Sequence, residues 1–145
     1  MIYWDTSTVI KLYVPEPDSE AWQNRAVHER RDMVSSSLLE AEFAFAVARK
    51  EQLGDVRTGG ARKLCHRLQA DISYGRIKVF PLSLDIVSTA TAIALERDPQ
   101  QSVRTLDGLH LATAIRLHCR EFVTTDQRLA SAARSLGFHV ISQPD

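Results

Sequence analysis

Four acidic side chains in this sequence lie where an α/β protein can use them for chemistry: Asp5, Glu42, Asp107 and Asp126. Asp5 follows a short apolar run, Asp126 closes the segment EFVTTD, Asp107 opens a helical stretch, and Glu42 lies within an apolar one. Two unit charges about 4 Å apart interact by roughly 4 kcal/mol at an effective dielectric of 20, so a cluster of carboxylates requires a cation. Oxygen ligands, with no His or Cys at metal spacing, favour Mg²⁺ or Mn²⁺ over Zn²⁺.

The chemistry open to such a pocket is narrow. One divalent ion, or two ions about 3.5–4 Å apart, can activate water and neutralise the charge that develops on a phosphate during in-line displacement. The hydroxyl groups of Thr6, Ser7 and Thr124 lie beside these acids in the sequence and can hold metal-bound water. The residues alone therefore predict metal-dependent phosphoryl chemistry.

Each acid also has a purely structural interpretation. Asp5 and Asp126 can act as N-caps that accept hydrogen bonds from the free amides of the following helix. Asp107 stands near a helix start, where the helix dipole favours a negative charge by about 0.3–1 kcal/mol. Taken one at a time, these positions do not distinguish a cap from a metal ligand.

Glu42 is the more informative acid because Glu40 stands beside it for comparison. The segment SLLE, from Ser37 to Glu40, has the pattern of a capping box, which would account for Glu40. Glu42 has apolar neighbours and no basic residue within one turn. Two positions on a helix differ by about 200° of rotation, so Glu42 is expected to point away from Glu40, towards the sheet edge. A distant arginine partner is the structural alternative.

Composition limits how the chain can attract a polyanion. The 145 residues contain 18 Lys+Arg and 18 Asp+Glu, so no net charge draws nucleic acid or membrane to the protein. Any RNA must therefore be held by bound cations or by a local basic patch, for which one polar helix offers Arg57, Arg62, Lys63 and Arg67. The alternative is a solvated helix face.

Two isolated cysteines and the lack of a leader or membrane segment predict a cytoplasmic protein with free thiols.

Hydrophobic periodicity predicts one domain of alternating strands and helices. Strands are expected at residues 2–4, 32–37, 76–82, 121–126 and 139–143, and helices at 5–14, 18–31, 38–50, 57–73, 83–98, 105–119 and 127–137. This alternation favours an α/β fold with a mostly parallel sheet covered on both faces. In such sheets ligands bind beyond the carboxyl ends of the strands, where Asp5 and Asp126 are expected.

Four stretches of the sequence resemble the PIN-domain family, and most closely its VapC-like toxin ribonucleases. They are YWDTSTVIKLYVPEPDSE, VSSSLLEAEF, LDGLHLATAIRL and FVTTDQRLASAARSLGF, and they occur in the family's order over nearly the whole chain. The family's acidic quartet falls on Asp5, Glu42, Asp107 and Asp126. Ser7 matches the polar residue after the first aspartate, and Thr124 the threonine before the last.

The resemblance implies a single nuclease domain over residues 1–145, with a three-layer α/β/α fold and strand order 3-2-1-4-5. It also implies Mg²⁺ or Mn²⁺, cleavage of single-stranded RNA by metal-activated water, a homodimer, and an antitoxin that blocks the site. His110 lies within LDGLHLATA, where a satisfied core histidine is expected rather than a catalytic base.

Two other functions remain open at this point. A PIN-like module can grip RNA or a partner without cutting, and sequence does not separate it from an active enzyme. A metal-dependent phosphatase of the haloacid dehalogenase type also opens with an aspartate at a strand end. It needs a second aspartate two residues later, and that position is Ser7 here.

Overall fold

The computed structural model describes residues 1–97 and 101–144. Its centre is a sheet of five parallel strands in the order β3-β2-β1-β4-β5. The strands are β1 (Ile2–Trp4), β2 (Met33–Ser36), β3 (Lys78–Phe80), β4 (Glu121–Val123) and β5 (His139–Ile141). The α/β class, the parallel sheet and the expected strand order are therefore confirmed.

The helices also follow the expected sequence of elements. They are α1 (Thr6–Val9), α2 (Ser19–His28), α3 (Leu38–Gln52), α4 (Gly60–Ser73), α5 (Leu84–Glu96), α6 (Thr105–Arg116) and α7 (Gln127–Ser135), with a 3₁₀ turn (η1) over Ile10–Leu12. Helix α4 begins later than the expected residue 57 because Gly59 has a left-handed backbone, with φ of +78°. The expected end of α5 at Asp98 lies outside the described residues.

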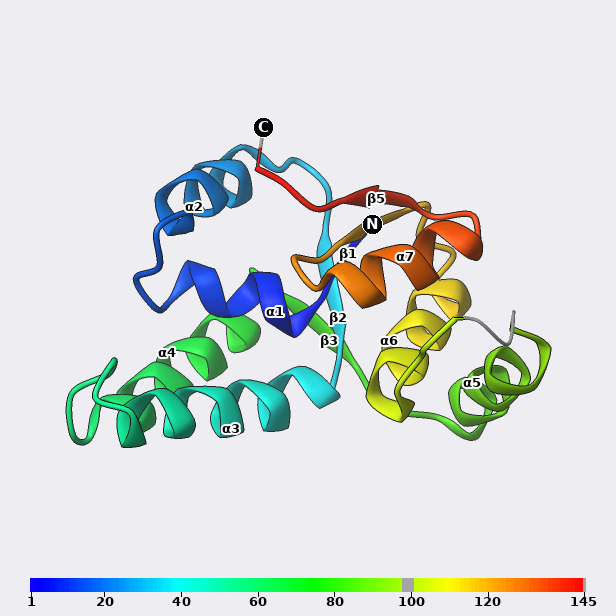
Figure 1. Ribbon diagram of the computed structural model, residues 1–145. Coiled ribbons are helices and arrows are strands. Elements are labelled where there is room, and N and C mark those ends of the chain that lie inside the picture. Colours follow the sequence, from blue (N-terminus) through cyan, green and yellow to red (C-terminus); the bar gives the residue numbers. More distant parts are fainter. Residues whose placement is uncertain (98–100, 145) are drawn as a thin grey trace.

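Helices cover both faces of the sheet (Figure 1). Helices α1 to α4 lie on one face, and α5, α6 and α7 on the other. Strand β1 shows how three residues serve both sides, because successive side chains of a strand point to opposite faces. Ile2 and Trp4 pack into the core beneath α1 to α4, whereas Tyr3 packs into the core with α6 and α7. All three are fully buried.

The expected capping box at the start of α3 is wrong. Ser37 has helical backbone angles, φ of −59° and ψ of −14°, and its side chain makes no capping hydrogen bond. Ser36, one residue earlier, accepts a hydrogen bond from the amide of Leu38 instead. The Glu40 carboxylate accepts a hydrogen bond from Gln69 on α4. Sequence spacing matched the motif, but the chain enters the helix with a different geometry.

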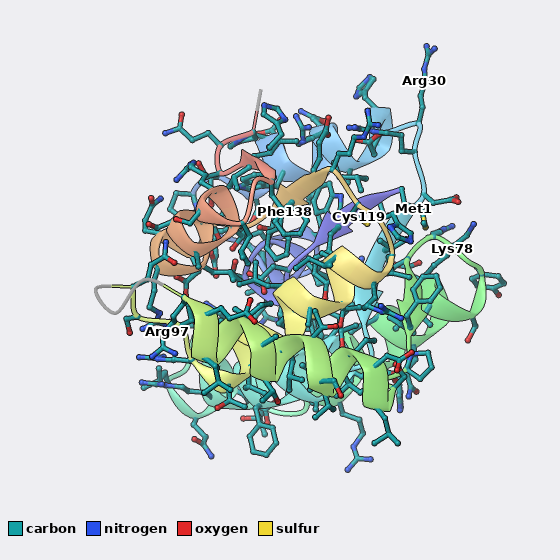
Figure 2. The ribbon with its side chains drawn as sticks, turned by 90° about the vertical axis from the view of Figure 1, so that its right-hand side faces the viewer. Met1, Arg30, Lys78, Arg97, Cys119 and Phe138 are labelled. Atoms are coloured by element: carbon teal, nitrogen blue, oxygen red, sulfur yellow. The ribbon has the colours of Figure 1, made fainter. Side chains whose placement is uncertain are left out.

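The strands all run in one direction, so their carboxyl ends meet at one edge of the sheet. Figure 2 shows Met1, Arg30 and Lys78 gathered on the side where β1, β2 and β3 begin. The opposite edge carries the residues that follow the strands, including Asp5 and Thr124.

No helix in the described ranges is long and apolar enough to cross a membrane. Cys65 and Cys119 are free thiols.

Candidate functional site

Asp5 comes directly after β1 and is the N-cap of α1. Its Oδ2 accepts hydrogen bonds from the Ser7 amide (3.2 Å), the Ser7 hydroxyl (2.5 Å) and the Thr124 hydroxyl (2.9 Å). The cap expected as an alternative is therefore present, yet the other carboxylate oxygen, Oδ1, is left facing His110 at 3.9 Å. Burial raises the pKa of Asp5, and the attraction of His110 and the hydrogen bonds offset only part of that rise. Folding therefore holds this carboxylate where a negative charge is costly.

Glu42 reaches the same place from α3, which begins after β2. Its Oε2 accepts hydrogen bonds from the Thr6 hydroxyl (2.5 Å) and from Nε2 of His110 (2.6 Å). Burial pushes the pKa of Glu42 upward, but the hydrogen bonds from His110 and Thr6 outweigh it and leave that pKa lowered. Glu42 thus points into the strand-end region while Glu40 turns towards α4, as the rotation of the helix predicts.

His110 is the residue that sequence reasoning did not place in the site. It is 1% exposed, and its Nδ1 lies 2.6 Å from the hydroxyl of Tyr3, which also accepts a hydrogen bond from the Ser36 amide. The expectation of a satisfied core histidine is therefore correct, but one of its two partners is Glu42. His110 stands three residues after Asp107, on the same side of α6. That spacing was the available signal.

The orientation of His110 suits positioning better than metal binding. An ionised Glu42 can only accept hydrogen bonds, so Nε2 of His110 must carry the proton between them. Burial lowers the pKa of His110, but Glu42 and Asp5 more than compensate, so that pKa is raised. A protonated Nε2 has no lone pair for a metal ion. In this arrangement His110 holds Glu42 in place.

Asp107 and Asp126 form a second pair of acids. Asp126 is the N-cap of α7, and its Oδ1 accepts from the amides of Arg128 and Leu129. Asp107 lies in the first turn of α6, where its Oδ2 accepts from the Arg104 amide at 3.2 Å. Both aspartates thus perform the structural roles expected as alternatives. Each also lies near the guanidinium of Arg128.

One cleft of about 510 Å³ brings the four predicted acids together. Asp5, Thr6 and Ser7 line it from α1, Glu42 from α3, Asp107 from α6, and Asp126 from the start of α7. Thr124 lies beneath it, buried and bonded to Asp5. Segments more than a hundred residues apart in the chain therefore meet at the carboxyl ends of the strands.

The inner part of this cleft fits a small divalent cation. Ligand atoms of Asp5, Glu42 and His110 all lie within 4.8 Å of one another. The metal donors among these three residues are the two carboxylates, of which Asp5 is costly to ionise without a cation, and hydroxyl groups surround them. Hard oxygen donors of this kind suit Mg²⁺ or Mn²⁺. His110 is the third group of this cluster, and because its Nε2 donates a hydrogen bond to Glu42 it positions that carboxylate and adds no nitrogen ligand to the oxygen set that the sequence predicted.

The basic residues expected to contact RNA lie elsewhere. Arg57, Arg62, Lys63 and Arg67 are all exposed, and none of them lines the acidic cleft. Arg62 borders a separate pocket between α3 and α4, and Arg67 lies over the ring of Tyr13. Their contact with RNA stays a prediction. Two arginines do line the cleft, Arg104 and Arg128.

Comparison with known proteins agrees with the fold. Residues 2–135 match the PIN domain. Ribonuclease VapC46 of Mycobacterium tuberculosis is 36% identical over 143 residues, covering 97% of this chain and 96% of that protein.

Solved structures share the architecture at lower sequence identity. The M. tuberculosis toxin VapC20, described as cleaving the sarcin–ricin loop, has a TM-score of 0.72 at 14% identity and covers 100% of both chains. A toxin–antitoxin complex from Klebsiella pneumoniae has a TM-score of 0.63 at 16% identity over 87% of each chain. The match over residues 2–135 and the 36% identity to a full-length relative are decisive. This chain belongs to the PIN-domain family, among its VapC-like members.

Proposed function

We propose that the chain is a metal-dependent endoribonuclease and the toxin of a toxin–antitoxin pair, acting as one nuclease domain over residues 1–145. The observation that carries the proposal is the meeting of Asp5 and Glu42 within 4.8 Å, in a cleft that Asp107 and Asp126 complete. A relative named as a ribonuclease, at 36% identity, supports the choice of RNA as substrate.

The chain's own residues organise this cleft before substrate arrives. Ser7 and Thr124 fix one oxygen of Asp5, and Thr6 and His110 fix one oxygen of Glu42. The opposite oxygens of these two carboxylates are therefore presented for ligand binding. When a Mg²⁺ or Mn²⁺ ion is bound, it supplies activation of water and neutralisation of charge on the phosphate. Asp107 and Asp126 are proposed to complete the set of ligands, directly or through water.

Hydrolysis at this site would form a bond between a water oxygen and phosphorus and break the bond from phosphorus to the 3′ oxygen. The 3′ oxygen leaves with a proton, so the expected products carry 5′-phosphate and 3′-hydroxyl ends. The phosphatase alternative is disfavoured because the position where a second acid is required is Ser7, whose hydroxyl donates a hydrogen bond to Asp5. Arg57, Arg62, Lys63 and Arg67 are proposed to bind the RNA backbone outside the cleft.

A pair of glutamates on one helix gives a matched test of the proposal. Glu42→Gln removes a charge from the cleft, whereas Glu40→Gln removes the same charge from the pocket between α3 and α4. Purified protein is incubated with labelled single-stranded RNA in Mn²⁺ or in EDTA, and the ends are mapped. We expect the Glu40→Gln variant and the wild type to cut only with Mn²⁺, and Glu42→Gln to be inactive. A wild type that binds RNA without cutting would favour the binding module instead.

Two exposed apolar surfaces support the proposed protein partners. Phe45 on α3 is 81% exposed, although Phe43 and Val47 beside it are buried, and we infer that the antitoxin covers Phe45. On α5, Leu84 is 86% and Leu95 81% exposed, and we infer that a second copy of the chain packs there. The cytoplasm is the proposed location, since an antitoxin must meet the toxin where RNA is available.

A further inference from the structure

Arg128 is a cation of the chain itself that lies among the acids of the cleft. It enters from the first turn of α7, two residues after Asp126. Its Nε lies 3.4 Å from Oδ2 of Asp107, and its Nη2 lies 3.6 Å from Oδ2 of Asp126. One guanidinium thus bridges two acids that belong to different helices.

The guanidinium is held there by charge rather than by fitted hydrogen bonds. The Nε–H of Arg128 is buried, yet it makes no hydrogen bond to any residue within the described ranges. A buried donor without an acceptor is unfavourable, and natural proteins seldom keep one without a functional reason. Both distances to the aspartates exceed those of a good charge-assisted hydrogen bond, about 2.7–2.9 Å. Arg128 can therefore leave this position without losing a well-formed network.

The two aspartates do not depend on Arg128 for their own placement. Backbone amides hold Asp126 through its Oδ1, and the Arg104 amide holds Asp107. These carboxylates stay in the cleft whether or not the guanidinium does. The same carboxylates are the ones proposed to complete a divalent-ion site.

We propose that Arg128 is an internal counter-cation that competes with the divalent ion for Asp107 and Asp126 and thereby sets the metal affinity of the cleft. The inference rests on the proposed function to the extent that the cleft binds such an ion. A guanidinium and a metal ion repel each other and draw on the same two carboxylates, so each weakens the binding of the other by an equal factor. Arg128 neutralises the outer acids in the metal-free chain and yields to the ion when it binds.

Removing the competing charge tests this role directly. Mn²⁺ binding is measured by calorimetry for the wild type, Arg128→Gln and Arg128→Lys. Arg134→Gln serves as the matched control, since Arg134 lies on the same helix and does not line the cleft. Arg128→Gln is expected to bind Mn²⁺ about tenfold more tightly, a gain of about 1.4 kcal/mol. Arg128→Lys keeps the charge and is expected to stay near the wild-type affinity, as is Arg134→Gln.

A second measurement needs no variant. In the wild-type protein, the Nε–H resonance of Arg128 is expected to shift, and its exchange with solvent to accelerate, as Mg²⁺ fills the site. An unchanged resonance at saturation, or an Arg128→Gln affinity equal to or below that of the wild type, would overturn the inference. If the inference about Arg128 fails but the wild type binds Mn²⁺ and Glu42→Gln does not, the proposed metal site still stands. If no variant binds Mn²⁺, both proposals are overturned together.

Discussion

Replacing Asp5 with asparagine keeps the size of the side chain and removes its charge from the most buried part of the cleft. Asparagine is as good an N-cap as aspartate, so α1 is expected to start normally. Its carbonyl oxygen can still accept hydrogen bonds from Ser7 and Thr124. The fold should therefore survive, and the effect of the charge alone can be measured.

The sign of the stability change follows from the raised pKa of Asp5. Burial, the largest cause, raises this pKa from the ordinary 3.8, so folding disfavours the ionised form. The stability of the metal-free wild type should then fall as the pH rises from about 3.8 through the raised pKa, and this fall should be absent from Asp5→Asn. At neutral pH the variant is expected to be the more stable protein when no metal is present.

The magnitude is a difference between opposing effects. Carboxylate oxygens of Asp5 and Glu42 lie within 4.8 Å. At that distance two full charges repel by roughly 3.5 kcal/mol at an effective dielectric of 20. The lost attraction to His110 and the weaker hydrogen bonds from Ser7 and Thr124 cancel much of this. We expect a net gain of about 1 kcal/mol, which raises the melting temperature by about 3 °C for a chain of this size.

Bound metal should reverse the order of the melting temperatures of the wild type and Asp5→Asn. Mn²⁺ at a hundredfold over its dissociation constant adds about 2.7 kcal/mol to the wild type, on the order of 8 °C, and nothing to Asp5→Asn. Thermal melting in EDTA and in Mn²⁺ measures both effects, and RNA cleavage by the variant should be lost. Asp85→Asn is the control, because Asp85 also lies at a helix start but is exposed and outside the cleft. An Asp5→Asn protein that melts lower than wild type in EDTA, or that keeps the Mn²⁺ shift, would refute the reasoning.

Three further predictions concern the rest of the molecule. Phe43→Ala should cost about 3–5 kcal/mol because Phe43 is fully buried, whereas Phe45→Ala should change stability by less than about 0.5 kcal/mol, and chemical unfolding measures both. Arg31 lowers the pKa of Glu29 to about 2, so Glu29 contributes stability above pH 4.5 that is lost towards pH 2. Because Arg31 is 41% exposed, solvent screening limits the loss of unfolding free energy in Glu29→Gln to about 1 kcal/mol at neutral pH. Unfolding measured at decreasing pH should show the difference between wild type and variant disappear towards pH 2. Leu95→Glu should convert the proposed homodimer to a monomer in light scattering, and a variant that keeps the mass of a dimer would place the contact between the copies away from α5.

Features with a strong local cause were predictable from the sequence. Glu42 stood out because a carboxylate within an apolar helix needs a polar destination, and the structure supplies one in Thr6 and His110. The strands were equally predictable, since short apolar runs between helices indicate a parallel sheet. The capping box of Ser37 and Glu40 failed because the motif specifies residue types, whereas a cap requires a non-helical backbone at its first residue.

His110 and Arg128 were not predictable in the same way. Each reads locally as an ordinary helix residue, and its role depends on which side chains of other elements come within a few ångströms. The ring of His110 meets Glu42 across 68 positions of sequence. Arg128 meets Asp107 only because α6 and α7 begin beside each other at the cleft. Contacts of this kind are consequences of the fold, and the spacing within α6 indicates only that Asp107 and His110 share one side of that helix.

These two residues also revise the electrostatic argument from which the site was inferred. Four carboxylates in one cleft were expected to require a cation, and the sequence pointed to Mg²⁺ or Mn²⁺ for that role. The chain provides cationic or proton-donating groups of its own, His110 against Asp5 and Glu42, and Arg128 against Asp107 and Asp126. We therefore expect the metal-free protein to fold, and the proposed divalent ion to bind a preformed site. The two groups differ in how they are held. The hydrogen bond with Tyr3 keeps His110 in place, whereas the buried Nε–H of Arg128 makes no hydrogen bond among the described residues and its guanidinium can be displaced. Metal binding should accordingly perturb the surroundings of α7 far more than those of β1, a contrast that amide hydrogen exchange with and without Mg²⁺ can measure residue by residue.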